Sequence, residues 1–79
     1  MKKKFCVIVR EFVGIDTIRF SKIYKFPCEE SALKFFYSEI GSFLYSIDDI
    51  YDIFKSETDN KMQLDIFCRG FYRQFILLK

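Results

Sequence analysis

The densest group of side chains that could do chemistry is the string Asp48-Asp49-x-x-Asp52. On a helix these three carboxylates would share one side and could approach a divalent cation. The string lacks the alternating acids and the central glycine of a calcium-binding loop, however. We therefore interpret it as an acidic surface that continues to Glu57 and Asp59. Such a surface suits an Arg- and Lys-rich groove on a partner protein.

Other patterns that carry catalysis or hold cofactors are missing from the sequence. The chain has no His, which is the commonest general base and metal ligand. Its three cysteines, Cys6, Cys28 and Cys68, form no C-x-x-C pair, so zinc and thioredoxin-like chemistry are not expected. The glycines are isolated and form no phosphate-binding loop. We expect no enzymatic activity, no metal and no cofactor. Free thiols fit a reducing compartment such as the cytoplasm.

Basic side chains near the start of the chain suggest a second kind of site. Arg10, Arg19 and Lys25 are spaced to share the face opposite the apolar one in a hairpin. Basic groups on such a face contact phosphates, and neighbouring Tyr or Phe rings stack on bases. The alternative function is therefore a small nucleic-acid-binding module that uses these three residues.

Charge is segregated along the chain, although the net charge is only +2. Residues 1–27 carry seven basic and two acidic side chains, a net charge of +5. Residues 28–65 carry three basic and nine acidic side chains, a net charge of −6. Residues 66–79 carry three basic side chains and no acidic one. This distribution predicts a surface with one pole that attracts anions and another that attracts cations.

Length and composition limit the class of protein further. A chain of 79 residues forms one small domain, over residues 1–79, and no apolar stretch approaches the roughly 18 residues that span a membrane. Phe and Tyr together number 16, more than one helix on one sheet needs for its core. Aromatic residues are enriched at protein interfaces. The surplus favours a protein-binding surface, or a homodimeric structural protein whose rings meet across a two-fold axis.

Two segments at the start of the chain alternate between apolar and polar residues. This pattern predicts strands over residues 4–12 and 17–26. The four residues between them include Gly14 and Asp16, which favour a turn. We therefore expect an antiparallel hairpin.

The next segment has the spacing of a helix. Pro27 ends the second strand because it has no N–H group to donate. Apolar side chains at spacings of three and four then predict a helix that begins near Cys28. It ends either at Ile40, with Gly41 as its C-terminal cap, or at Tyr45.

The rest of the chain predicts three more strands. The stretch after the helix fits a strand or a second helix, and we favour a strand over residues 49–56 because the turn at residues 57–60 needs one before it. Strands follow over residues 62–68 and 71–78. They are joined by a two-residue turn, or they form one long strand with a bulge at Gly70.

The expected fold class is α+β, an antiparallel sheet in the order ββαβββ, or ββααββ, with one main helix packed on one face. We expect the core to contain the following apolar side chains: Val7, Val9, Phe20, Leu33, Phe36, Ile40 and Leu64.

In its size, charge segregation and expected layout the chain resembles the small inhibitor proteins of phages and mobile elements that block bacterial immunity, the anti-CRISPR type. The resemblance implies a stoichiometric inhibitor in the cytoplasm of a bacterial host, which binds a nuclease complex or CRISPR effector by surface complementarity. The expected function is thus a non-enzymatic protein-binding inhibitor or adaptor.

Overall fold

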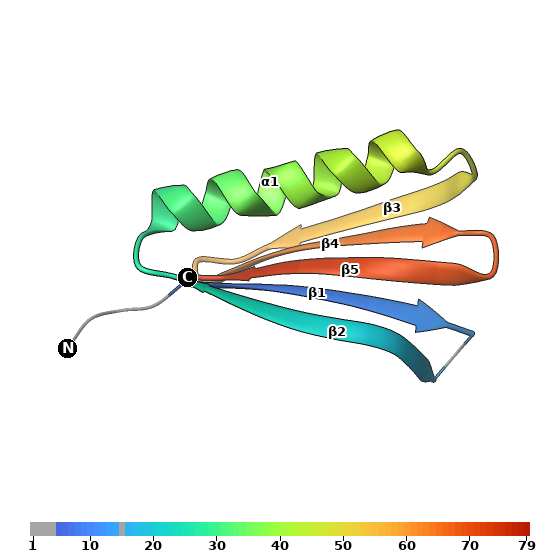
Figure 1. Ribbon diagram of the computed structural model, residues 1–79, viewed down its shortest axis with the longest axis horizontal. Coiled ribbons are helices and arrows are strands. Elements are labelled where there is room, and N and C mark those ends of the chain that lie inside the picture. Colours follow the sequence, from blue (N-terminus) through green and yellow to red (C-terminus); the bar gives the residue numbers. More distant parts are fainter. Residues whose placement is uncertain (1–4, 15) are drawn as a thin grey trace.

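A computed structural model describes residues 5–14 and 16–79 (Figure 1), so Lys4 at the start of the first expected strand and Ile15 in the first turn lie outside the described residues. These residues form one antiparallel sheet of five strands and one helix, which confirms the order ββαβββ. The elements are β1 (Phe5–Val13), β2 (Thr17–Phe26), α1 (Glu29–Ser46), β3 (Ile50–Glu57), β4 (Lys61–Cys68) and β5 (Phe71–Leu78).

The strands lie in the order β2-β1-β5-β4-β3, with β5 in the middle and β2 and β3 at the edges. β1 and β2 form the expected hairpin, and β3, β4 and β5 follow one another as a meander. The chain returns to the hairpin when β5 pairs with β1. α1 must therefore carry the chain from one edge strand to the other (Figure 1).

The helix extends through Gly41 to Ser46, so an end at Ile40 with Gly41 as the cap is wrong. Phe43 explains the difference, because it is buried in the core and its packing outweighs the poor helix propensity of one glycine. In the last turn the Ser46 hydroxyl donates a hydrogen bond to the Phe43 carbonyl at 3.0 Å. This bond satisfies one of the carbonyls that a helix end leaves unpaired.

The segment after the helix is strand β3, as favoured, and the alternative of a second helix is wrong. Its pairing with β4 along nearly its whole length stabilises the extended form. β4 ends at Cys68 and β5 begins at Phe71, so the two-residue turn is confirmed and the single bulged strand is not. Gly70 has a φ of 86°, a backbone conformation that glycine adopts without steric cost.

The core lies between α1 and the face of the sheet that carries Val7 and Val9, which we call the inner face. Four of the seven expected core residues are buried there: Val7, Val9, Phe36 and Ile40. The other three, Phe20, Leu33 and Leu64, are only partly buried and pack at the margin of the core. Phe20 lies on the edge strand β2, and Leu64 lies on β4, beyond the strands β1, β2 and β5 that α1 packs against. No helix among the described residues is long and apolar enough to cross a membrane.

Candidate protein-binding surfaces

Strand β3 is the most exposed element of the sheet. Seven of its eight residues are exposed, although three of those seven are large and apolar. Tyr51 and Phe54 are 78% and 57% exposed, and Ile53 is exposed as well. β3 is also an edge strand, so among the described strands it pairs through its backbone with β4 alone. An apolar strand with one unpaired edge is a template for another chain.

The five carboxylates expected at a partner interface lie along this edge. Asp48 and Asp49 precede β3, Asp52 lies within it, Glu57 ends it and Asp59 is in the turn that follows. All five are exposed, and none of them forms an ion pair within the described part of the chain.

The five carboxylates form two groups. The groups come nearest at Asp52 and Glu57, which are about 17 Å apart along the strand at roughly 3.3 Å per residue. The β3 edge, by which we mean residues 48–59, therefore presents negative charge at both ends with apolar side chains between.

The three basic residues of the first hairpin do not share one face, and that expectation is wrong. Arg10 and Lys25 lie on the outer face, the face away from α1. Arg19 does not join them, because the β1–β2 register shifts beside it: Phe12 pairs with Ile18, and Glu11 pairs with Phe20. Such a bulge changes the direction of the extra side chain. The expected basic stretch at residues 2–4 lies outside the described residues.

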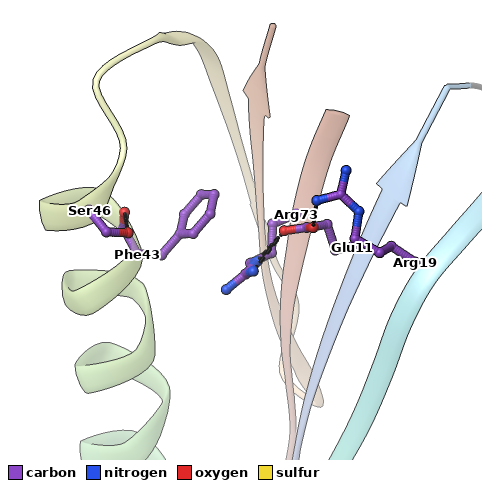
Figure 2. Close-up of polar contacts among 5 residues, drawn as sticks. All are labelled: Glu11, Arg19, Phe43, Ser46 and Arg73. Atoms are coloured by element: carbon purple, nitrogen blue, oxygen red, sulfur yellow. Dashed lines mark hydrogen bonds and ion pairs between the residues drawn. The ribbon is translucent and has the colours of Figure 1, made fainter. Parts of the chain in front are cut away.

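The bulge brings Arg19 to a buried carboxylate that sequence reasoning missed. Figure 2 shows Glu11 between Arg19 and Arg73, with the Phe43 ring directed from α1 toward Arg73. Arg19 Nη1 donates to Glu11 Oε2 at 2.8 Å, and Arg73 Nε and Nη2 donate to Glu11 Oε1 at 3.0 and 2.7 Å. The Arg73 guanidinium also lies over the Phe43 and Phe20 rings, 4.4 and 4.8 Å from their centroids. We call Glu11, Arg19 and Arg73 the ion cluster.

The ion cluster connects β2, β1, β5 and the end of α1. Both Glu11 oxygens accept hydrogen bonds from guanidinium groups, so the carboxylate holds the two arginines together. The sequence did hold a signal. Glu11 continues the alternation of Val7 and Val9 on the inner face, and Arg73 sits between Phe71 and Phe75 in the same way. An acid and a base that both fall on an apolar face are expected to meet.

The outer face carries a row of four aromatic rings across four strands, which we call the aromatic row. Phe12 stacks on Tyr72 with a centroid distance of 4.7 Å, and Tyr72 stacks on Phe67 at 4.9 Å. The Phe54 and Phe67 rings pack edge to face, with a centroid distance of 5.5 Å and an interplanar angle of 89°. Phe12 and Phe67 stack on Tyr72 from its two neighbouring strands, so both faces of the Tyr72 ring are covered. A base-stacking site needs free ring faces, and the aromatic row is therefore better suited to a protein surface.

The remaining features are a cavity and the cysteine thiols. A cavity of about 120 Å³ lies between α1 and β4, lined mainly by apolar side chains including Phe36, Ile40 and Met62. Among the described residues, no group of three or more Cys, Asp or Glu side chains is placed to hold a metal ion. Cys68 is buried in the core, while Cys28 is exposed beside the start of α1.

Comparison with protein-family models, with curated proteins and with solved structures finds no match to this chain. The surfaces described above are therefore the basis for inferring its function.

Proposed function

We propose that this chain is a non-enzymatic protein-binding inhibitor or adaptor that docks through its β3 edge. One observation carries the proposal: the most exposed strand of the sheet combines large apolar side chains with carboxylates that have no ion-pair partner. Apolar residues at the centre of a surface and charges at its rim are the ordinary composition of a protein interface.

The chemistry of the β3 edge defines the partner. Five exposed carboxylates favour a groove lined with Arg and Lys, and the unpaired backbone of β3 offers hydrogen bonds to an extended segment. Basic grooves of this kind normally hold nucleic acid. The chain would then inhibit a nucleic-acid-processing complex of a bacterial host, of the CRISPR type, by occupying the groove in place of its nucleic acid.

Direct binding of nucleic acid has less support. That function requires Arg10, Arg19 and Lys25 to contact phosphates together, whereas Arg19 is hydrogen-bonded to Glu11. Arg10 and Lys25 share the outer face with Asp65 and Asp52, whose charges repel phosphate. The aromatic row adds no free stacking platform.

The test compares two charge-reversed variants. In Asp49→Lys/Asp52→Lys, attraction to a basic groove becomes repulsion, while the fold is kept because exposed carboxylates contribute little to stability. Asp16→Lys/Glu30→Lys makes the same change in net charge at exposed sites away from β3 and is the matched control. Each immobilised protein is used to capture partners from a nuclease-treated bacterial lysate, and the recovered partner is then titrated in purified form.

We expect the parent and the control to retain the partner, and the β3 variant to lose it. The parent should also displace a labelled oligonucleotide from that partner. Added salt should slow association, because charge steering is screened beyond about 8 Å at physiological ionic strength. Equal binding by both variants, or partners that disappear once nuclease is added, would contradict the proposal.

A further inference from the structure

The outer face of the sheet carries large apolar side chains, although no helix or strand of the described residues covers it. It contains the aromatic row, and it also carries Ile18 and Ile23 of β2, which are 52% and 60% exposed. The strands are eight to ten residues long and five in number. With strands about 4.8 Å apart and about 3.3 Å per residue, this face measures roughly 600 Å².

We infer that two copies of this chain pack outer face to outer face, around a two-fold axis parallel to β5. β5 is the middle strand of the sheet (Figure 1), so this axis places β5 over β5, β1 over β4 and β2 over β3 of the second copy. Two faces of this size bury about 1,200 Å², the lower end of the range for specific interfaces. Two stacked sheets with their strands nearly aligned form an ordinary β-sandwich.

The charges on the outer face select this axis. Arg10, Gln74 and Asp65 lie side by side in one row, because Arg10 pairs with Gln74 and Gln74 pairs with Asp65. The axis along β5 reverses the row, so Arg10 faces Asp65 of the second copy, and Gln74 faces its own counterpart. The two-fold symmetry also places Asp65 of the first copy opposite Arg10 of the second, so two equivalent ion pairs form. Within one copy, Arg10 and Asp65 form no ion pair in the described part of the chain.

The same axis matches the apolar residues. Phe12, Tyr72 and Phe67 form the neighbouring row, so Phe12 faces Phe67 of the second copy and Tyr72 faces Tyr72. A two-fold axis across the strands would instead place β1 over β1, and Arg10 would face the described outer residues of β1, none of which is acidic. Only the axis along β5 pairs the charges as well as the rings.

The test is the oligomeric state of the full chain, measured by sedimentation velocity over a range of concentrations without any partner. We expect the parent to sediment as a dimer of 9.6 kDa subunits. Arg10→Glu alone and Asp65→Lys alone each place like charges together twice in the dimer, and each should weaken association about a hundredfold. The double variant Arg10→Glu/Asp65→Lys restores both pairs in reverse and should bring association back to within about fivefold of the parent.

Lys34→Glu is the matched control, because it makes the same charge change as Arg10→Glu at an exposed site on α1 and should leave the dimer unchanged. Circular dichroism checks that each variant keeps its sheet. A parent that is monomeric at millimolar concentration overturns the inference and leaves the outer face to a different protein. A dimer that neither single variant weakens, or that the double variant fails to restore, overturns it too. The measurement involves no basic partner. Because Asp52 also lies on the outer face, the β3 variant is sedimented alone as well, which keeps the two results separate.

Discussion

Replacing Glu11 with Gln should destabilise this protein more than any other single change of charge. The Glu11 side chain is 5% exposed, and both of its oxygens accept hydrogen bonds from arginines. The Gln side chain keeps the shape but removes the negative charge. Arg73, which is 22% exposed and lies between two aromatic rings, would then hold a positive charge with no counter-ion.

The expected magnitude follows from the burial of each partner. Removing one member of a buried ion pair typically costs 3–5 kcal/mol, because the remaining charge is left uncompensated. Arg19 is 55% exposed, and an exposed ion pair contributes about 0–1 kcal/mol. We therefore expect a loss of about 3–5 kcal/mol for Glu11→Gln, about 3 kcal/mol for Arg73→Met and under about 1 kcal/mol for Arg19→Ala. A domain of this length has only about 4–12 kcal/mol in total.

The assay is urea unfolding followed by circular dichroism. If Glu11→Gln does not fold, the double variant Glu11→Leu/Arg73→Met still tests the argument. Replacing a buried ion pair by apolar side chains of similar size is often neutral or stabilising, so the double variant should be more stable than either single variant. A loss below about 1 kcal/mol for Glu11→Gln, or a loss for Arg19→Ala as large as that for Glu11→Gln, would refute a central role for the buried Glu11–Arg73 pair.

Two further predictions concern the core and the thiols. Phe36→Ala should cost about 3–5 kcal/mol in the same unfolding assay, because the ring is 2% exposed in the centre of the helix–sheet interface; a loss below about 1 kcal/mol would contradict that placement. Iodoacetamide should modify Cys28 well before Cys68, as followed by mass spectrometry, because the Ser31 hydroxyl holds the pKa of the exposed Cys28 thiol below its ordinary value, whereas burial raises that of Cys68. Ser31→Ala should slow the modification of Cys28 near pH 7, where the thiolate is a minor form, and should leave the rate unchanged at pH 10 or above; equal rates at pH 7 would show that the hydroxyl has no effect.

The sequence was sufficient to predict the order of elements, because each signal was local. Alternation located the strands, Pro27 ended β2, and Gly70 marked the two-residue turn. The errors arose where tertiary packing outweighed a local preference. Gly41 favours a helix end, but burying Phe43 against Phe71 and Phe75 stabilises one more turn and a half of helix.

The candidate sites were predictable only in part, and for a related reason. The exposed carboxylates of the β3 edge needed only the sequence, since charged residues next to a turn remain in solvent. The ion cluster needed the register of β1 against both of its neighbours. If the strand had no bulge, strict alternation would place the Arg19 side chain on the outer face beside Arg10. A bulge of one residue is invisible to a period-two pattern, so it changed a predicted basic surface into a structural cluster.

The uncovered surfaces follow from the proportions of the fold. A sheet of five strands is about 24 Å wide, whereas a helix with its side chains is 10–12 Å across. The single helix must also run from the end of β2 to the start of β3, and it packs against β1, β2 and β5 on the way. The inner side of β3 is left exposed, and none of the described elements covers the outer face. The sequence nevertheless places apolar and aromatic residues on both, at Ile53 on the inner side of β3 and at Phe12, Phe54, Phe67 and Tyr72 on the outer face. A chain that keeps rings where its own helix cannot reach is expected to cover them with another protein surface: a second copy on the outer face and a basic partner along the β3 edge.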